Sequence, residues 1–449
     1  MEDIKAGQNL NMFLIGGLTI LLCFILHLVY KAIFSTTKRD ASLTTESDSG
    51  AHVDDAVSEA RQVESRPSKS KKRAQWKGKS EFTHPWLLKN LKGHPGNVLH
   101  MDFSANGKFM AATCDDGSVI LWDIRNLNQK DHKTLRVNIP YDYASRVAWS
   151  PDSKAFIVHT SRDNNIIVYK IEKKKDGAIG SATPVIAFDK VHEDIIAGFG
   201  ISSNGKFMMS CSTKTDMVIW DLKGQQLDRL DTYLMSTHSA KISPCGRFVV
   251  ATGFSPDVKV MEVCFTKTGE FKQVTKAFEL TGHSSGVYDV AFDVDTSHIA
   301  TISKDGTWRL YHTKIEYSRG ESPHVLETGT YSQCAASPTI ALSPNAEVLA
   351  VTVDGAVEFY DTYTGQLYDT VENLYPGIVS YICFDASGKY LFVCGDKVVR
   401  VLHNVCGYFT TIGSCTRLLS HKQTSATTER LNDTIKSCKE ILAGFGKQA

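Results

Sequence analysis

Hydrophobic residues follow two contrasting patterns along this chain. From Met12 to Tyr30 an unbroken, largely apolar run carries no formal charge, and as a helix it spans about 28 Å, close to the roughly 30 Å hydrocarbon core of a bilayer. From residue 81 onward, short stretches alternate apolar with polar or small residues and are separated by turn dipeptides such as Asn-Gly and Asp-Gly. This second pattern is typical of strands joined by hairpins. We therefore predict a transmembrane helix over 12–30 and an all-β region over 81–404.

The apolar run favours a retained anchor, preceded by a short flank at 1–11. The alternative is a cleaved signal peptide, which has a shorter apolar core and a small-residue cleavage site; the following KAIFSTTKRD offers no clear site of that kind. Lys31, Lys38 and Arg39 follow the run and only Lys5 precedes it. The positive-inside rule then places the C-terminal side in the cytosol. The only glycosylation sequon, at Asn432, is expected to stay unused.

Residues 31–80 read as a disordered linker in two halves of opposite charge. The half at 40–64 is acidic and poor in large apolar residues, so it cannot bury a core. The half at 66–79 is basic and contains no acid. Its candidate contact residues for RNA or a membrane surface are Lys69, Lys71, Lys72, Arg73, Trp76, Lys77 and Lys79. Four interpretations stay open: an anionic leaflet, RNA or ribosomal phosphate with stacking on Trp76, a nuclear address, or a solvated linker.

Seven in-phase units follow between Leu91 and Asn404, at about 45 residues each. The clearest unit, Leu91–Ile124, contains Gly93-His94, a turn at Asp116-Gly117 and a strand ending in Trp122-Asp123. These features resemble a WD40 repeat, and the resemblance implies an all-β, seven-bladed propeller. Seven units also suit a closed ring.

The resemblance implies that His, Ser or Thr, Asp and Trp form a buried hydrogen-bonded set in a blade. The fullest candidate uses His94, Thr113 or Cys114, Asp116 and Trp122, and unit five offers His283, Ser303 and Asp305 with Tyr311 in place of Trp. The expected structural blade residues are His94, Asp116, Trp122, Asp163, Trp220, His283, Asp305, Asp354 and Asp396. His283, Ser303 and Asp305 also match the residue types of a hydrolase triad, but no nucleophile-elbow motif accompanies them.

Both ends of the β region carry further signals. Glu81–Asn90 looks like the outer strand that the last unit lacks, and pairing the two ends removes open sheet edges. The tail at 405–449 is expected to contain one amphipathic helix, because Leu431, Ile435, Cys438 and Leu442 recur at helical spacing. Its apolar stripe is expected to pack on the propeller rim; the alternative is a helix that docks a partner.

Composition narrows the function. The net charge of +1 averages over segments of opposite sign, and the eleven cysteines show no paired spacing. We interpret them as reduced thiols; the alternative is a secreted disulfide framework. No metal-ligand spacing, Walker loop or dinucleotide fingerprint is present. We therefore expect no enzyme, no cofactor and no metal.

The stretch from Ser243 to Asp293, followed by Ser303–Tyr311, resembles a transducin-beta-like, membrane-anchored branch of the WD40-repeat family. Departures are Met261 and Tyr311 at Trp positions, and Lys214 where a turn Asp is usual. The resemblance implies a non-catalytic scaffold at the endoplasmic reticulum membrane with a cytosolic propeller. Implied partners are the stress-sensing kinase of that membrane and components of translation, including RNA. The alternative function is an RNA- or ribosome-binding tether acting through 66–79. Candidate protein contacts are loop aromatics: Tyr141, Tyr143, Tyr233, Tyr317, Tyr331 and Tyr375.

Overall fold

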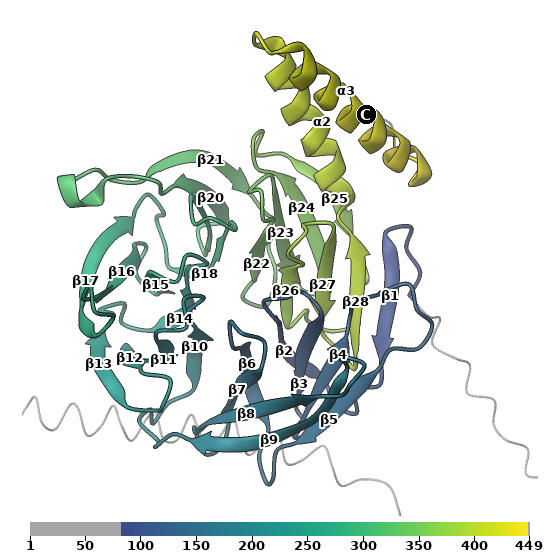
Figure 1. Ribbon diagram of the computed structural model, residues 1–449. Helices are drawn as coiled ribbons and strands as arrows, with labels where there is room; N and C mark the ends of the chain where they lie inside the picture. The colour runs from purple at the N-terminus through teal and green to yellow at the C-terminus, as the bar shows by residue number, and fades with distance from the viewer. Residues whose placement is uncertain (1–81, 448–449) are drawn as a thin grey trace, which may run out of the picture. The chain divides into compact units, whose positions relative to one another are not determined.

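The computed structural model describes residues 82–447, which form a ring of antiparallel sheets followed by two helices (Figure 1). Seven four-stranded blades are present in this part of the chain, two of them joined into one eight-stranded sheet. The first strands of successive blades contact one another, so they lie nearest the ring axis. The propeller expected from the seven sequence units is therefore confirmed.

The blades are numbered in chain order, with β1 completing the seventh. Blade one is β2 (Val98–Phe103), β3 (Phe109–Cys114), β4 (Ser118–Asp123) and β5 (Thr134–Asn138). Blade two is β6 (Ala144–Trp149), β7 (Ala155–Thr160), β8 (Ile166–Lys173) and β9 (Ile179–Ala187). Blade three is β10 (Ile196–Ile201), β11 (Met208–Ser212), β12 (Asp216–Trp220) and β13 (Gln226–Asp231). Blade four is β14 (Thr237–Ile242), β15 (Phe248–Gly253), β16 (Val258–Phe265) and β17 (Phe271–Leu280).

The remaining blades follow the same plan. Blade five is β18 (Val287–Phe292), β19 (His298–Ser303), β20 (Thr307–His312) and β21 (His324–Thr330), with a 3-10 turn η1 (Tyr317–Arg319) before β21. Blade six is β22 (Ile340–Leu342), β23 (Val348–Val353), β24 (Ala356–Asp361) and β25 (Leu367–Val371). Blade seven is β26 (Tyr381–Phe384), β27 (Tyr390–Cys394), β28 (Val398–His403) and β1 (Leu87–Lys92).

Strand β1 closes the ring. It pairs antiparallel with β28, with Leu87 opposite Leu402 and Lys92 opposite Val398. Just before it, Trp86 is buried against Phe359 of blade six. The outer strand expected from Glu81–Asn90 therefore exists, although it begins and ends a few residues later. Its pairing covers the edge that β28 would otherwise expose.

The hydrophobic core is divided into seven clusters, one at each junction between neighbouring blades. Second strands are buried on both faces because a blade packs against two neighbours; in β3 all six residues are buried. Outer strands have a solvent side, as the mostly exposed β5 shows. The first strands of blades three and four are joined directly, where Gly198 pairs with Ala240. A side chain at Gly198 would collide with Ala240, so only glycine permits this contact.

Strand direction sorts the loops onto two faces of the ring. Connections between blades, and turns between the second and third strands of a blade, share one end of the strands; we call this the connector face. Turns between first and second strands, and between third and fourth strands, share the other end; we call this the hairpin face. On the hairpin face a serine often closes the turn between the first and second strands of a blade. Ser104 Oγ accepts a hydrogen bond from Phe109 N over 3.0 Å, and Ser202 Oγ accepts one from Phe207 N over 3.1 Å.

Two helices follow the ring, so the expectation of a single helix in the tail was wrong. Helix α2 (Val405–Ser420) begins directly after β28, and Asn404 caps it by accepting from Gly407 N. Helix α3 (Ser425–Gly444) folds back on α2 beside blades six and seven (Figure 1). Leu431, Cys438 and Leu442 of α3 are buried, as their helical spacing predicts. Within 82–447, no helix has the length and apolar character needed to span a bilayer.

Candidate functional site

A buried chain of four side chains runs through blade three. Trp220 Nε1 donates to Ser210 Oγ over 2.8 Å, Ser210 Oγ lies 2.7 Å from His192 Nε2, and His192 Nδ1 lies 2.6 Å from Asp216 Oδ2. Burial lowers the pKa of His192, so the imidazole is neutral and its one proton faces Asp216. Arg229 pairs with the same carboxylate at 3.1 Å. Each polar group is used within the blade, so the chain of bonds is structural.

Of these four residues the sequence indicates only Trp220, and Lys214 departs from the usual turn aspartate. A spacing signal was available: a histidine precedes the strand aromatic by 28 residues at His94–Trp122, His192–Trp220 and His283–Tyr311. The acid was harder to find, because it lies two residues beyond Lys214, at the start of β12. Lys214 instead pairs with Asp194 at 2.9 Å.

Blade five holds a shorter version of this network. His283 Nδ1 lies 3.0 Å from Asp305 Oδ2, and His283 Nε2 lies 2.8 Å from Thr301 Oγ1. Burial opposes ionisation of Asp305, yet hydrogen bonds from Thr307, the Ser284 amide and His283 lower its pKa to about 2. The expectation that Ser303 takes part was wrong: its hydroxyl donates to backbone carbonyls at 2.9 and 3.0 Å.

These bonds also remove the hydrolase interpretation of blade five. A serine nucleophile must donate to the histidine that acts as its base, whereas Ser303 Oγ is committed to the carbonyls of Ser285 and Gly286. Tyr311 does not complete the network either, since its hydroxyl donates to the carbonyl of Thr281 over 3.0 Å.

Blade one replaces the network with one direct bond. Trp122 Nε1 donates to His94 Nε2 over 3.1 Å, and burial lowers the pKa of His94 to about 4. Neither Thr113 nor Cys114 bridges the two rings, because the position equivalent to Ser210 is Ala112. Asp116 is also separate from His94: it accepts from Ser118 Oγ over 2.7 Å and pairs with Arg136 at 2.9 Å.

The other expected aspartates lie at turns on the connector face. Asp354 Oδ1 accepts from the amides of Ala335 and Ala336, over 3.0 and 3.2 Å. The amide of Asp163 donates to the buried Asp142 over 3.1 Å, while the side chains of Asp163 and Asp396 are exposed. None of the three contacts a histidine in a blade network.

Polar side chains near the axis join neighbouring blades. Lys241 of blade four pairs with Asp289 of blade five at 2.9 Å, and Asp289 Oδ2 accepts from Ile340 N of blade six over 3.1 Å. Asp102 of blade one accepts from Trp149 N of blade two over 2.7 Å, and burial raises its pKa to about 6. The polar groups of Lys241, Asp289 and Asp102 are therefore already bonded across the junctions between blades.

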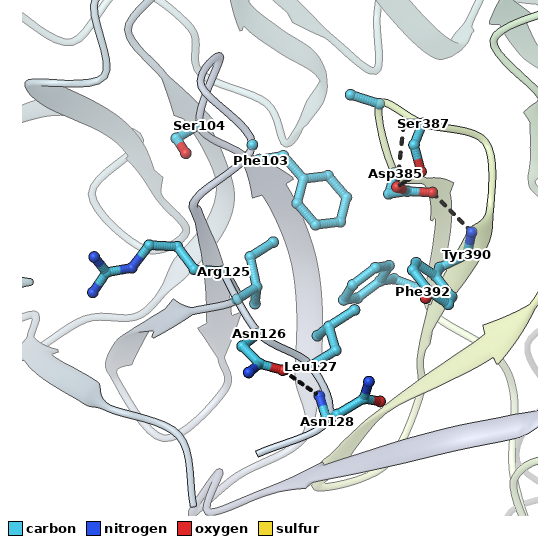
Figure 2. Close-up of a pocket in the computed structure, with 13 residues that line it drawn as sticks. Phe103, Ser104, Arg125, Asn126, Leu127, Asn128, Asp385, Ser387, Tyr390 and Phe392 are labelled. Carbon is cyan, nitrogen blue, oxygen red and sulfur yellow. Dashed lines mark hydrogen bonds between the residues drawn. The ribbon is translucent and has the colours of Figure 1, made fainter.

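A pocket of about 410 Å³ opens on the hairpin face at the junction of blades one and seven (Figure 2). Phe103, Phe392 and Leu127 point toward its middle, with the two aromatic rings packed edge to face at 4.8 Å. At its rim Asp385 accepts from the amides of Tyr390 and Ser387. The floor of the pocket is thus apolar, and the carboxylate of Asp385 is already hydrogen-bonded. The pocket is therefore better suited to bind an apolar side chain than to act as a catalytic site.

The arginine and asparagine side chains at the rim of this pocket are also bonded to other residues of the protein. The guanidinium of Arg125 forms a fork with Asp123, with Nε–Oδ1 at 2.9 Å, and turns aside from the pocket (Figure 2). Asn126 Oδ1 accepts from the amide of Asn128 over 3.1 Å. Among residues 82–447, no cluster of three or more His, Cys, Asp and Glu side chains is arranged to hold a metal ion.

The connector face displays large apolar side chains. Tyr141, Tyr233 and Met235 are 97%, 80% and 79% exposed, and Ile195 and Phe254 project from neighbouring loops. Tyr141, Tyr233 and Met235 have φ values of 63°, 53° and 64°. Such left-handed backbone is rare for bulky residues and stays only where the surroundings fix it.

The structure separates the six candidate tyrosines. Tyr141 and Tyr233 are free at the surface. Tyr375 is buried and donates to the carbonyls of Val393 and Val398, and Tyr331 donates to the carbonyl of Ser303. The remaining two, Tyr143 and Tyr317, are partly buried. Only the first pair therefore offers whole side chains to a partner.

Several predictions concern residues outside 82–447. These are the apolar run at 12–30, the linker at 31–80 and the basic residues from Lys69 to Lys79. Within the described residues, ten cysteines are free thiols, in agreement with the interpretation as reduced side chains.

Comparison with known proteins defines the class. The family model "WD domain, G-beta repeat" matches residues 85–123 and 274–312. The chain is 39% identical to human transducin beta-like protein 2 over 367 residues, which cover 81% of this chain and 82% of that protein. It is 39% identical to the mouse protein of the same name over 366 residues, with 81% and 83% covered. Periodic tryptophan protein 2 of Arabidopsis thaliana is 26% identical over 332 residues, 68% of this chain and 33% of that protein.

These matches place the chain among the WD40-repeat propellers, which generally act as non-catalytic scaffolds. Within that class, the chain belongs to the transducin beta-like protein 2 family.

Proposed function

We propose that this protein is a non-catalytic scaffold, anchored in the endoplasmic reticulum membrane by residues 12–30, that presents its propeller to protein partners in the cytosol. The exposed apolar side chains of the connector face carry the proposal. Large apolar groups held outward by fixed loops favour burial against another protein. The closed hydrogen-bond networks of blades three and five leave His192 and His283 no free proton-transfer role.

The partner that we propose is the stress-sensing kinase of the same membrane. The choice of partner rests on the family resemblance in the sequence. The excess of Lys and Arg after the apolar run over those before it supports a cytosolic propeller. The scaffold would then act in the unfolded-protein response. The sequon at Asn432 offers a topology check, because a glycan there would place the propeller in the lumen.

The direct test is to purify the full-length protein from endoplasmic reticulum membranes, with and without stress and with and without RNase. The scaffold proposal expects recovery of a membrane kinase that depends on stress and resists RNase. Absence of any stable protein partner under all four conditions would refute it.

A second candidate function is an RNA- or ribosome-binding tether. It is favoured by residues 66–79, whose seven basic side chains occur without an acid and would bind phosphate in a salt-dependent manner. Replacing Lys69, Lys71, Lys72 and Arg73 by Gln should then abolish RNA cross-linking, and unchanged cross-linking would exclude this segment.

A further inference from the structure

Hydrogen bonds and one buried side chain hold the backbone of the connector-face loops that carry Tyr141, Tyr233 and Met235. Leu234 lies between Tyr233 and Met235 and is fully buried, so it fixes the loop while its neighbours project. Asp231 Oδ1 accepts from Tyr233 N over 2.7 Å. Arg162 donates to the carbonyl of Tyr141 over 3.2 Å. The surface is therefore organised before any partner arrives, which lowers the entropy cost of binding.

Charge is distributed unequally between the two faces of the ring. The loops of the connector face contain twelve Asp and Glu and five Lys and Arg, a net charge of −7. The loops of the hairpin face contain eleven acidic and fourteen basic residues, a net charge of +3. The one basic residue in the 213–215 turn, Lys214, is already paired with Asp194. The connector-face loops of blades two to four, from 139–143 to 254–257, contain six acidic and three basic residues, so negative charge also prevails around the apolar side chains of this part of the face.

We propose that the connector face of blades two to four binds a protein segment that carries lysine or arginine beside large apolar side chains. This inference rests on the proposed scaffold function and adds the chemistry of the partner. Tyr141 and Tyr233 offer ring faces to cations, Met235 and Phe254 offer adaptable apolar contact, and the acidic loops steer a basic segment toward them. The same negative charge repels nucleic-acid phosphate and anionic lipid.

The test uses the full-length chain in detergent and three fluorescent peptides. The first peptide combines Lys, Leu and Phe; the second has Glu in place of Lys; the third has Ser in place of Leu and Phe. We expect the first peptide to bind, the other two to bind at least about tenfold more weakly, and the affinity of the first to fall as salt rises.

Surface variants locate the site. Tyr141→Ser with Tyr233→Ser should weaken binding of the first peptide by about tenfold or more. Val294→Ser is the matched control, because Val294 is 65% exposed on the hairpin face, and it should leave binding unchanged. All three side chains are at the surface, and unchanged thermal unfolding checks that the variants fold.

Two results would overturn the inference: equal binding of the Lys and Glu peptides, or full binding of the first peptide by the tyrosine variant. The scaffold proposal is judged separately by recovery of the membrane kinase. If the kinase is recovered with wild type and with the tyrosine variant alike, the scaffold stands and this surface is wrong.

Discussion

Ser210 shows how one hydroxyl determines a blade network. It accepts from Trp220 and donates to His192 at the same time, and its side chain is buried. Ser210→Ala leaves two buried polar atoms without partners, so we expect a loss of about 1–3 kcal/mol in the free energy of unfolding, measured by urea denaturation.

Ser203→Ala is the control for this loss, because Ser203 is exposed and bonds only to the carbonyl of Pro244; it should change stability by less than about 0.5 kcal/mol. Equal effects of the two variants would mean that the network contributes nothing.

Buried histidines predict how stability depends on pH. Burial lowers the pKa of His94 and of His159 to about 4, from 6.5. The unfolded chain therefore binds more protons in this range, and stability falls as pH drops from about 6.5 toward 4. We expect a loss of about 2 kcal/mol per histidine between pH 7 and pH 5, measured by urea titration at both values.

The buried Asp102 contributes to the pH dependence of stability with the opposite sign. Its raised pKa of about 6 means that protonation on acidification favours the folded state, so Asp102→Asn should steepen the loss. His94→Gln with His159→Gln should flatten it. A wild-type stability that is constant or rises from pH 7 to pH 5 would contradict this assignment.

At the residue scale, the sequence locates a blade residue where the repeat spacing and the strand pattern agree on its position, as for Trp122, Trp220 and His283. It failed for small hydroxyl residues: Ser303 and Thr301 lie two residues apart in β19, so they point to the same side and only packing distinguishes them. The acid of blade three was missed because Lys214 occupies the turn position and Asp216 lies two residues further on, at the start of β12.

At the scale of elements, the closing strand β1 depends on its preceding anchor. Trp86 is buried between blades six and seven against Phe359 and Tyr368. Trp86→Ala should lower the free energy of unfolding by about 3–5 kcal/mol, measured by denaturant unfolding.

Removing residues 81–90 should have a larger effect and unfold or oligomerise the ring, because β28 becomes an open edge. Unchanged melting and a monomeric elution volume after that deletion would refute the closure.

Helix α2 is fastened to blade six by one acid. Glu347 accepts from Ser414 Oγ over 2.6 Å and from Thr410 Oγ1 over 3.3 Å. Glu347→Ala should therefore speed hydrogen exchange across 405–420 while the blades keep their protection. Glu321→Ala, at an exposed position on the same face, serves as the control. Equal exchange in wild type and the Glu347 variant would show that the helix is held by apolar packing alone.

The tail also shows why one helix was predicted and another was missed. In α3 the buried residues recur at a clear helical period. Helix α2 contains Gly407 and Gly413 and several threonines, which are weak helix formers. Its formation relies on the Asn404 cap and on contacts with blade six, which are tertiary features.

For the whole molecule, the seven blades were predictable because every unit repeats a buried second strand between two turns. The outer strands were less visible, since β5 and β9 are largely exposed and lack a strong apolar alternation. The shared faces of the loops follow from topology, not from any local pattern. Tyr141 and Tyr375 therefore look alike in sequence, although one is exposed and the other is buried.

We propose that the ring works as a scaffold through its connector face. The most direct measurement is site-specific photo-cross-linking of the full-length protein in endoplasmic reticulum membranes under stress, with the photoreactive residue at position 141, 233 or 294. We predict cross-links to a membrane kinase from positions 141 and 233, through a basic and apolar segment, and none from 294. Cross-links from 294 alone, or none from any position in a protein that still recovers the kinase, would contradict the account.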